Sequence, residues 1–320
     1  MEKKIKIFVA GHKGMLGSAI LNKLKKKSFN VIHVAPKEKL DLSNKKKVLK
    51  YFKRNRFDHI YLCAAKVGGI MANQTFPADY IFENLSIQLN VINASFVTKV
   101  KRLLFIGSTC IYPKVTKQPM KEEYLLSSKP ELSNEPYAIS KIAGIKMCES
   151  YNRQFGTDFR SVMPPNMYGP GDSFDPDKSH VISGLIKRFH DGKINNKKKI
   201  KIWGTGKPLR EFLYVDDAAN ICVEIMNKKK NLFNKKTKPQ LSQINIGCGK
   251  SISIKKLAEM ISKVIGYRGR IFFDKRYPDG HPKKVGDISK QISLVGNIAK
   301  ISLEEGIKKT YLDFLSKLKK

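Results

Sequence analysis

The feature that most constrains the fold of this chain is the alternation of short apolar runs with helical patterns in its first half. The apolar runs predict buried strands at Ile5–Ala10, Val31–Ala35, His59–Ala65, Leu103–Gly107 and Phe159–Met163. The helical patterns between them lie at Met15–Lys27, Lys45–Asn55, Ala78–Val97 and Tyr137–Phe155. Repeated strand–helix alternation favours a parallel sheet with helices on both faces. We therefore predict an α/β fold with a doubly wound parallel sheet, in which ligands bind beyond the carboxyl ends of the strands.

A glycine-rich segment follows the first predicted strand and opens the first helix. It consists of Gly11, His12, Lys13, Gly14, Met15, Leu16 and Gly17. Glycines at these positions let the backbone turn tightly and approach a pyrophosphate, which binds at the helix N-terminus. A purely structural turn is the alternative, and the order of strand, glycines and helix argues against it. We predict a Rossmann-type dinucleotide site.

The end of the second predicted strand bears on the choice of cofactor. An acidic residue there binds the ribose hydroxyls of NAD, whereas a basic residue accommodates the 2′-phosphate of NADP. Lys37 stands at this end and Lys13 lies in the glycine segment, so we expect NADP(H). The nearby acids Glu38 and Asp41 weaken the case for NADP(H). A surface lysine is also ordinary in a chain this rich in lysine.

The character of the sequence changes at Pro164, where turn-forming residues become frequent. We predict a smaller α/β domain that closes over the sheet and binds the substrate. The predicted division gives 1–168 to the NADP-binding Rossmann domain, with 212–240 returning to it. Residues 169–211 and 241–320 are assigned to the substrate-binding domain.

Tyr137 and Lys141 are four residues apart and share one face of a predicted helix. With Ser108 they are the residue types of a ketone reductase. A ketone that receives a hydride needs a proton at its oxygen, and a phenol supplies one when a nearby ammonium lowers the pKa of that phenol. The alternative is a solvated helix face, because tyrosine and lysine are both frequent in this chain.

Ser108 and Cys110 leave the end of the strand Leu103–Gly107. In extended backbone, residues i and i+2 point the same way, so we expect both side chains to face one pocket. A thiol beside the reductase residues suggests a second chemistry there. The alternative for Cys110 is a small buried hydrophobe, which is the usual role of a lone cysteine.

The chain carries 62 Lys and Arg against 27 Asp and Glu, a formal net charge of +35. That charge invites a nucleic-acid function. The lysines, however, fall in short scattered runs, and no basic stripe interleaved with aromatic residues is visible, so we expect no nucleic-acid partner. No run of about 18 apolar residues occurs, so we expect no membrane span. The five cysteines lack metal-ligand or disulfide spacing, so we expect no metal and a cytoplasmic protein.

Several longer motifs carry a resemblance to a known family. They are Ala10–Ala19, Ala64–Ile70, Gly107–Pro113, Asn134–Gly144, Ser179–Ile182, Trp203–Gly206, Arg210–Phe212 and Pro278–Gly280. Together they resemble the extended short-chain dehydrogenase/reductases, and within these the GDP-L-fucose synthases. The resemblance spans nearly the whole chain, and its motifs are long enough to be specific.

The resemblance implies two reactions in one pocket. The family epimerises C3 and C5 of GDP-4-keto-6-deoxy-D-mannose and then reduces the C4 ketone with NADPH, which gives GDP-L-fucose. Protons next to a ketone can be removed when the enolate oxygen is stabilised, here by Tyr137 and Ser108. Epimerisation needs a base on one face of the sugar and an acid on the other. The resemblance makes Cys110 the base and His180 the acid.

The resemblance also implies the binding residues. Arg188 and Arg210 would contact the diphosphate, for which a guanidinium is well suited. Trp203 and Asp279 would help to hold the nucleotide sugar, although core packing is the alternative for Trp203, the only tryptophan. The implied cofactor contacts beyond the glycine segment are Lys37, Ile106, Gly107, Lys141, Pro164, Pro165, Asn166, Met167 and His180.

The chain departs from the family pattern at a few positions. Pro165 replaces a small polar residue and removes an N–H group, which puts one cofactor contact in doubt. Lys13 and Lys37 stand where arginine is commoner, so the bidentate fork is lost. The resemblance further implies a homodimer through the helices Ala78–Val97 and Tyr137–Phe155.

Two kinds of alternative remain. A nucleotide-sugar 4,6-dehydratase is expected to carry an acidic pair just after the position of Ser108, where this chain has Thr109 and Cys110. A 4-epimerase would bind NAD tightly and would not need Cys110 with His180. A non-catalytic dinucleotide-sensing module or an RNA-binding protein would not need the three reductase residues together.

Overall fold

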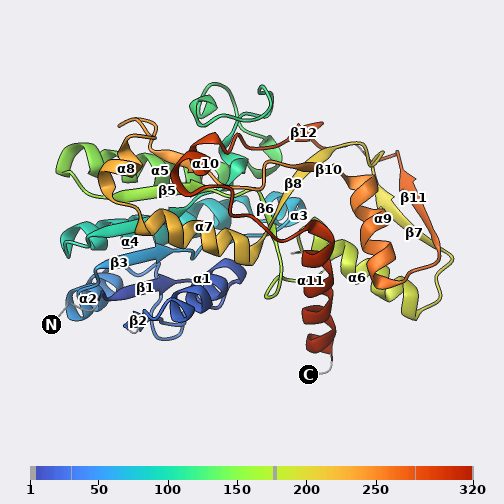
Figure 1. Ribbon diagram of the computed structural model, residues 1–320, viewed down its shortest axis with the longest axis horizontal. Coiled ribbons are helices and arrows are strands. Elements are labelled where there is room, and N and C mark those ends of the chain that lie inside the picture. Colours follow the sequence, from blue (N-terminus) through green and yellow to red (C-terminus); the bar gives the residue numbers. More distant parts are fainter. Residues whose placement is uncertain (1–4, 30, 176–178, 278, 319–320) are drawn as a thin grey trace.

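The computed structural model describes residues 5–29, 31–175, 179–277 and 279–318 (Figure 1). Its largest element is a six-stranded sheet in the order β2-β1-β3-β4-β5-β9. The strands are β1 (Ile7–Ala10), β2 (Ile32–His33), β3 (His59–Leu62), β4 (Arg102–Ile106), β5 (Phe159–Met163) and β9 (Gln243–Asn245). All neighbouring pairs are parallel. The predicted α/β class and the central parallel sheet are confirmed.

Helices cover both faces of this sheet (Figure 1). On one face lie α1 (Met15–Lys26) and α7 (Val215–Asn227), and on the other lie α2 (Lys45–Asn55), α4 (Pro77–Val97) and α5 (Glu135–Phe155). Side chains alternate between these two layers, so Val9 packs towards α1 and α7 while Phe8 packs towards α2. The strands are therefore buried on both faces, which explains their continuous apolar runs.

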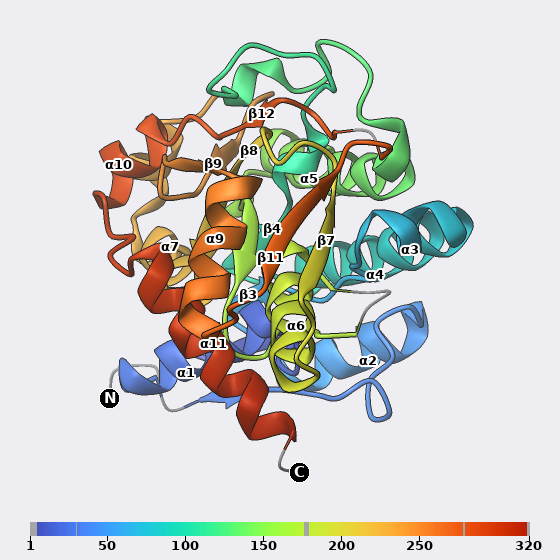
Figure 2. The ribbon, with the colours of Figure 1, turned by 90° about the vertical axis from the view of Figure 1, so that its right-hand side faces the viewer.

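A smaller body forms the right-hand side of Figure 1. It contains a four-stranded sheet of β6 (Asn166–Tyr168), β8 (Leu209–Tyr214), β10 (Ser251–Ser253) and β12 (Lys283–Lys284), and a parallel pair of β7 (Lys199–Trp203) and β11 (Arg270–Asp274). Helices α6 (Val181–Ile194), α9 (Ile254–Ile265) and α11 (Leu303–Leu318) pack with these strands around a third apolar core. Figure 2 shows β7 and β11 beside α6 and α9 on this side of the molecule.

Strand β9 corrects one part of the predicted domain division. It lies in the segment 241–320 that was assigned to the second domain, yet Gln243–Asn245 pairs with Ser161–Met163 of β5. A run of three residues is too short to show the period of a strand, so the sequence pattern missed it. The remainder of the division stays a prediction.

Several element bounds also differ from those predicted. Strand β2 has two residues instead of Val31–Ala35, because only β1 pairs with it and Pro36 follows. Three short helices were not expected, namely α3 (Ile70–Thr75), α8 (Lys230–Asn234) and α10 (Ser289–Val295). Single 3₁₀ turns lie at η1 (Thr109–Ile111), η2 (Glu122–Tyr124) and η3 (Leu132–Asn134).

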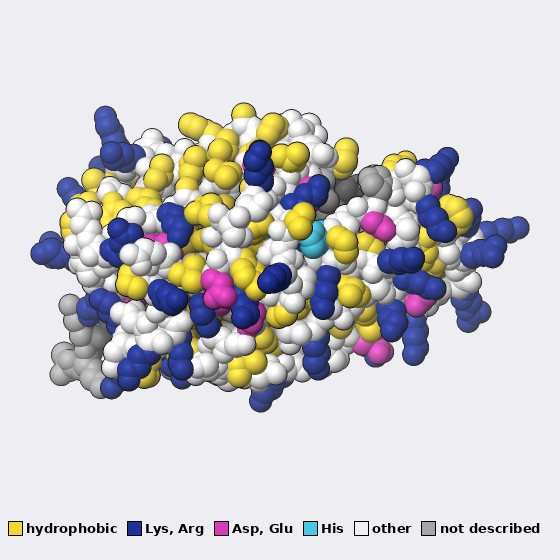
Figure 3. Space-filling view, turned by 90° about the horizontal axis from the view of Figure 1, so that it is seen from above, with side chains coloured by type: hydrophobic (Ala, Val, Ile, Leu, Met, Phe, Trp, Pro, Cys, Tyr) yellow, Lys and Arg dark blue, Asp and Glu magenta, His cyan; other side chains and the backbone are white. Residues whose placement is uncertain are grey.

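The surface is basic without a single basic stripe on the face drawn in Figure 3. Lys and Arg side chains are spread over that face, with apolar groups between them. Within the described ranges, every helix is too short or too polar to cross a membrane.

Candidate active site

The glycine segment forms a cradle between β1 and α1. Gly11 has a φ of +86°, and a Cβ there would lie 2.6 Å from the backbone nitrogen of Ala64. A Cβ at Gly17 would lie 2.1 Å from the carbonyl oxygen of Gly11. Only glycine fits either position, so the loop packs tightly against the end of β3. Gly14 caps α1 without a side-chain acceptor, which leaves the first-turn N–H groups of the helix for an anion.

The basic residues predicted for the 2′-phosphate lie at the surface beside this cradle. The Lys13 ammonium is 3.7 Å from the Glu38 carboxylate, and Lys37 is exposed. The pKa of Glu38 is lowered, first by a hydrogen bond with its own backbone and then by Lys13. Asp41 accepts hydrogen bonds from the hydroxyl and N–H of Ser43 at 2.7 and 2.9 Å, so its carboxylate is engaged within its own turn. The side chains therefore fit a phosphate better than a ribose diol.

Ser108 has extended backbone, but Cys110 lies in the 3₁₀ turn η1, so the prediction of extended backbone through both residues is wrong at Cys110. Ser108 caps the 3₁₀ turn η1, and its hydroxyl accepts the N–H of Cys110 at 3.2 Å. By accepting this backbone N–H, the serine hydroxyl favours a turn over extended backbone, as serine side chains often do. Both side chains nevertheless act on Tyr137, because each contributes to the pKa of that phenol. That both side chains face one pocket stays a prediction.

Tyr137 lies in the first turn of α5, directly after Pro136. Burial raises the pKa of the Tyr137 phenol, the nearby Cys110 raises it further, and a hydrogen bond with Ser108 lowers it. The phenol is therefore a weak acid in this state, and the lowering of its pKa by Lys141 stays a prediction.

Lys141 lies one turn further along α5 and is buried. Its ammonium donates a hydrogen bond to the carbonyl of Ile106 at 2.8 Å and lies 5.7 Å from the centre of the Tyr137 ring. Burial lowers the pKa of Lys141 to about 8, and Cys63, at the end of β3, opposes this. The ammonium is thus engaged by the Ile106 carbonyl and lies beside the Tyr137 ring.

The strand ends that carry the predicted cofactor contacts lie against one another. The N–H of Thr109 donates to the carbonyl of Pro164 at 3.0 Å, and a Cβ at Gly107 would lie 2.4 Å from the Met163 side chain. Asn166 donates to the carbonyl of Glu211 at 3.3 Å. Segments 106–110 and 163–167 are therefore adjacent at the carboxyl ends of β4 and β5. The cofactor contacts of Pro164, Pro165, Asn166 and Met167 stay predictions.

His180 is the N-cap residue of α6. Its Nδ1 lies 3.6 Å from the carboxylate of Asp172, too far for a hydrogen bond but close enough for an ion pair. Asp172 raises the pKa of His180, and burial opposes it. Asp172 is a site residue that the sequence did not reveal, because a single aspartate in a turn gives no signal of a histidine partner. The placement of His180 opposite Cys110 stays a prediction.

The predicted substrate residues come together in the smaller body. The Arg210 guanidinium donates to the carbonyls of Leu209 and His281 at 2.9 and 2.6 Å. Burial lowers the pKa of Arg210, and the nearby Asp279 and Cys110 oppose this. Arg210 therefore lies between the predicted nucleotide residues and the thiol.

Two further residues predicted to bind the substrate, Arg188 and Trp203, involve strand β7. Arg188 donates to the carbonyl of Lys201 at 3.0 Å, and burial lowers the pKa of Arg188. Trp203 is 54% exposed, so core packing is ruled out for it. An exposed tryptophan at a strand end is suited to contact a ligand.

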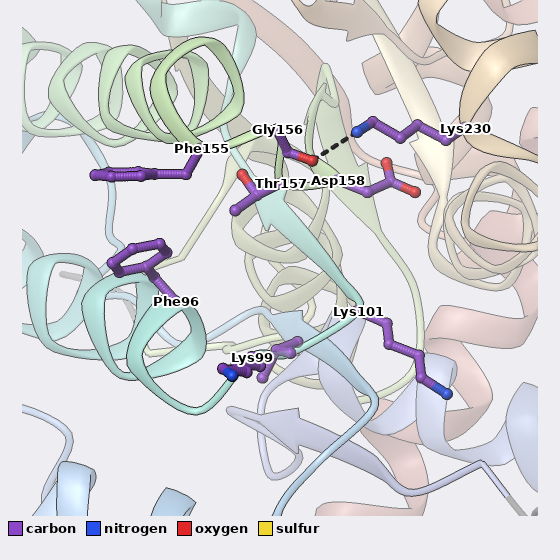
Figure 4. Close-up of a pocket in the computed structure, with 9 residues that line it drawn as sticks. Phe96, Lys99, Lys101, Phe155, Gly156, Thr157, Asp158 and Lys230 are labelled. Carbon is purple, nitrogen blue, oxygen red and sulfur yellow. Dashed lines mark hydrogen bonds between the residues drawn. The ribbon is translucent and has the colours of Figure 1, made fainter.

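The described residues also contain a hollow of about 390 Å³, drawn in Figure 4, that does not belong to this site. The rings of Phe96 and Phe155 line one side of it, and Lys101 and Lys230 line the other (Figure 4). Lys101 directly precedes β4, so the hollow lies at the amino ends of the strands. In the described ranges, three or more His, Cys, Asp or Glu side chains are nowhere grouped as a metal site requires.

Comparison with known proteins identifies the class first. Residues 7–247 match the NAD dependent epimerase/dehydratase family, and the chain belongs to that family. It is 48% identical over 312 residues to the GDP-L-fucose synthase of Escherichia coli (strain K12), covering 98% of this chain and 97% of that protein. The resemblance that the motifs predicted is confirmed.

Comparison with solved structures agrees with this family assignment. A GDP-6-OMe-4-keto-L-xylo-heptose reductase from Campylobacter jejuni superposes with a TM-score of 0.93 at 37% identity and covers 99% of both chains. A GDP-L-fucose synthetase from Naegleria fowleri bound to NADP has a TM-score of 0.88 at 25% identity, covering 100% of this chain and 96% of that one.

Proposed function

We propose that this chain converts GDP-4-keto-6-deoxy-D-mannose into GDP-L-fucose with NADPH, by epimerisation at C3 and C5 followed by reduction at C4. The observation that carries the proposal is that Ser108 bonds the N–H of Cys110, both influence the Tyr137 phenol, and Arg210 lies within electrostatic reach of the thiol. Reductase residues, a thiol and a guanidinium for the diphosphate are thereby combined beside a dinucleotide cradle. A simple reductase has no use for the thiol.

The cofactor fits the residues present. The crowded glycines Gly11 and Gly17 allow a pyrophosphate to approach the backbone, and the uncapped first turn of α1 offers N–H groups to it. Lys13 and Lys37 would bind the 2′-phosphate. NADPH supplies a hydride when it is bound.

In the proposed epimerisation, the Cys110 thiolate takes the proton from the carbon next to the ketone. The electron pair of the broken C–H bond moves to the carbonyl oxygen, where Tyr137 and Ser108 stabilise the enolate. His180 then delivers a proton to the other face of the same carbon, which inverts it. The Asp172 carboxylate raises the pKa of His180 and so favours its protonated form. Solvent then takes the proton from the Cys110 thiol and returns one to His180, after which the same steps at the second carbon complete the epimerisation.

In the proposed reduction, Tyr137 gives its proton to the C4 oxygen as hydride reaches C4. Lys141 is then required to stabilise the phenolate that remains, and its pKa of about 8 keeps it charged at neutral pH. Arg188 and Arg210 hold the diphosphate, while Trp203 and Asp279 hold the nucleoside side of the substrate.

A coupled assay tests this function. The chain is supplied with GDP-4-keto-6-deoxy-D-mannose and NADPH, and nicotinamide oxidation and GDP-L-fucose are measured. We expect both, with NADPH preferred over NADH. No turnover with either nucleotide would refute the proposal.

A second candidate is a GDP-keto-sugar 4-reductase without epimerisation, favoured by the similarity to the Campylobacter reductase. Such an enzyme would consume NADPH but would not exchange protons at C3 and C5. Mass analysis of the product after reaction in heavy water separates the two candidates.

The homodimer belongs to this proposal. Helices α4 and α5 pack against each other and present large exposed apolar side chains, namely Phe82, Leu89 and Val97 on α4 and Ile139 and Phe155 on α5. A second copy would cover this face. We also place the protein in the cytoplasm, because all five of its cysteines are free thiols.

A further inference from the structure

A second aromatic ring lies against Trp203. The indole of Trp203 and the ring of Tyr277 are stacked, with centroids 4.6 Å apart and planes inclined by 14°. Both are surface residues, since Trp203 is 54% and Tyr277 is 41% exposed. Trp203 ends β7 opposite Asp274, the last residue of β11, and Tyr277 follows three residues later. The two rings therefore come from the ends of two paired strands and belong to no core.

The two turns that carry these rings are fixed to each other by one carbonyl group. The N–H of Gly204, next to Trp203, donates to the carbonyl of Asp274 at 3.0 Å, and the N–H of Tyr277 donates to the same oxygen at 3.3 Å. The buried Asp274 carboxylate accepts two hydrogen bonds from the Arg276 guanidinium, at 2.9 and 2.7 Å. The relative position of the rings is thus set by the backbone and by a bidentate ion pair.

The stack adjoins the residues proposed to hold the nucleotide. Asp279, two residues after Tyr277, accepts the N–H of Thr205 at 2.8 Å. Its carboxylate also acts on the guanidinium of Arg210. A continuous line of residues therefore runs from the stacked rings to Arg210, where the diphosphate is proposed to bind. The exposed end of that line is the place for the base of the nucleotide.

We propose that Tyr277 is a positioning residue for the substrate, whose ring holds the indole of Trp203 ready to stack on the guanine base. This inference rests on the proposed function. Stacked aromatic pairs gain energy beyond that of simple burial, and an indole fixed in advance loses less freedom when the base arrives. Trp203 touches the base and Tyr277 touches Trp203, so the effect of Tyr277 falls on binding and not on the chemical steps.

Fluorescence is a direct probe, because Trp203 is the only tryptophan of the chain. GDP alone is titrated into the full-length protein while indole emission is followed, and KM and kcat for the GDP-keto-sugar are measured in parallel. The variants are Tyr277→Ala, Tyr277→Leu, which keeps an apolar group without stacking, and Tyr277→Phe, which keeps the ring. Phe272→Ala is the matched control, because Phe272 is an exposed aromatic residue of β11 that packs under Lys199 at 3.8 Å instead of against Trp203.

We expect Tyr277→Ala and Tyr277→Leu to shift the emission to the red and to weaken GDP binding about threefold to tenfold. KM should rise by the same factor with kcat unchanged, while Tyr277→Phe and Phe272→Ala behave as the wild type. Unchanged GDP binding in Tyr277→Ala, or equal weakening in Phe272→Ala, overturns the inference. If the wild-type indole emission does not change on addition of GDP while turnover is normal, the inference about Tyr277 is overturned and the proposed function still stands. Absence of turnover in the wild type refutes the proposed function itself.

Discussion

The cofactor half and the substrate half of this site are built in opposite ways. In the cofactor half, Gly11, Gly14 and Gly17 lie within one loop and the start of one helix, and the backbone itself forms the cradle. In the substrate half, Trp203 and Arg210 come from β7 and β8, and Asp279 follows β11. The first half is a local structure with a local sequence signature. The second half exists only after distant segments have folded together.

The residues proposed to carry the chemistry lie between the two halves, and the largest effect is expected from changing them. Tyr137→Phe removes only a hydroxyl from a half-buried ring, so folding and NADPH binding should persist. Reduction should slow by about 10²–10⁴-fold, because no proton reaches the C4 oxygen. Stopped-flow NADPH oxidation measures this.

The matched control for that variant is Tyr151→Phe, on the same helix, whose hydroxyl donates to Asn93 at 3.0 Å. It should keep nearly full activity. A Tyr137→Phe enzyme with more than about a tenth of the wild-type rate would show that another group supplies the proton.

The second prediction concerns a variant that damages only the cofactor half of the site. Gly11→Ala places a Cβ 2.6 Å from the nitrogen of Ala64 at a φ of +86°. We expect a loss of about 1–3 kcal/mol in the free energy of unfolding and at least a tenfold weaker binding of NADPH, with GDP binding unchanged. Denaturant titration and calorimetry measure the two quantities.

Gly156→Ala is the control for Gly11→Ala, because it introduces backbone strain without crowding. Gly156 also has a positive φ, +65°, but a Cβ there meets nothing within 4 Å, and it lies at the far end of α5. Its replacement should cost stability without affecting NADPH. Equal weakening of NADPH binding in both variants would contradict the proposal that the glycine segment binds the cofactor.

The comparison also explains what the sequence predicts well and what it does not. The alternating elements and the glycine segment depend on neighbours in the chain, so they are visible as patterns. The turn after Ser108 was missed because it depends on a hydrogen bond from the N–H of Cys110 to the serine hydroxyl, which the sequence pattern does not show. Strand β9 and the Asp172–His180 pair depend on contacts across the fold, for which a single sequence carries no signal. The exposure of Trp203 likewise follows from the arrangement of β7 and β11.

The third prediction concerns pH and the substrate half. Asp172 raises the pKa of His180, so protonated His180 persists to higher pH than a free histidine would. The stabilising ion pair is fully present below the ordinary histidine pKa and is lost as pH rises through the raised value. Asp172→Asn should therefore move the alkaline decline of proton exchange at C3 and C5 to lower pH. An unmoved pH profile would exclude His180 as the acid that Asp172 supports.

The smallest effect is expected at the edge of the cofactor half. Glu38→Gln frees Lys13, whose ammonium lies 3.7 Å from that carboxylate, to meet the 2′-phosphate. The KM for NADPH should fall by about twofold to threefold at low ionic strength, and the gain should vanish in salt. Glu305→Gln, which breaks an ion pair with Lys309 on α11, is the control and should leave KM unchanged. A lower KM for NADH as well would show that the effect is not directed at the phosphate.

The proposed mechanism places two chemistries in one pocket, with Cys110 as the base of the first. Wild type and Cys110→Ala are incubated in heavy water with GDP-4-keto-6-deoxy-D-mannose and without NADPH, and deuterium at C3 and C5 is measured by NMR. We expect rapid deuterium uptake at both carbons in the wild type. In Cys110→Ala, uptake should fall by about 10²-fold or more, since the base is gone. Deuterium uptake by Cys110→Ala at the wild-type rate would exclude Cys110 as the base.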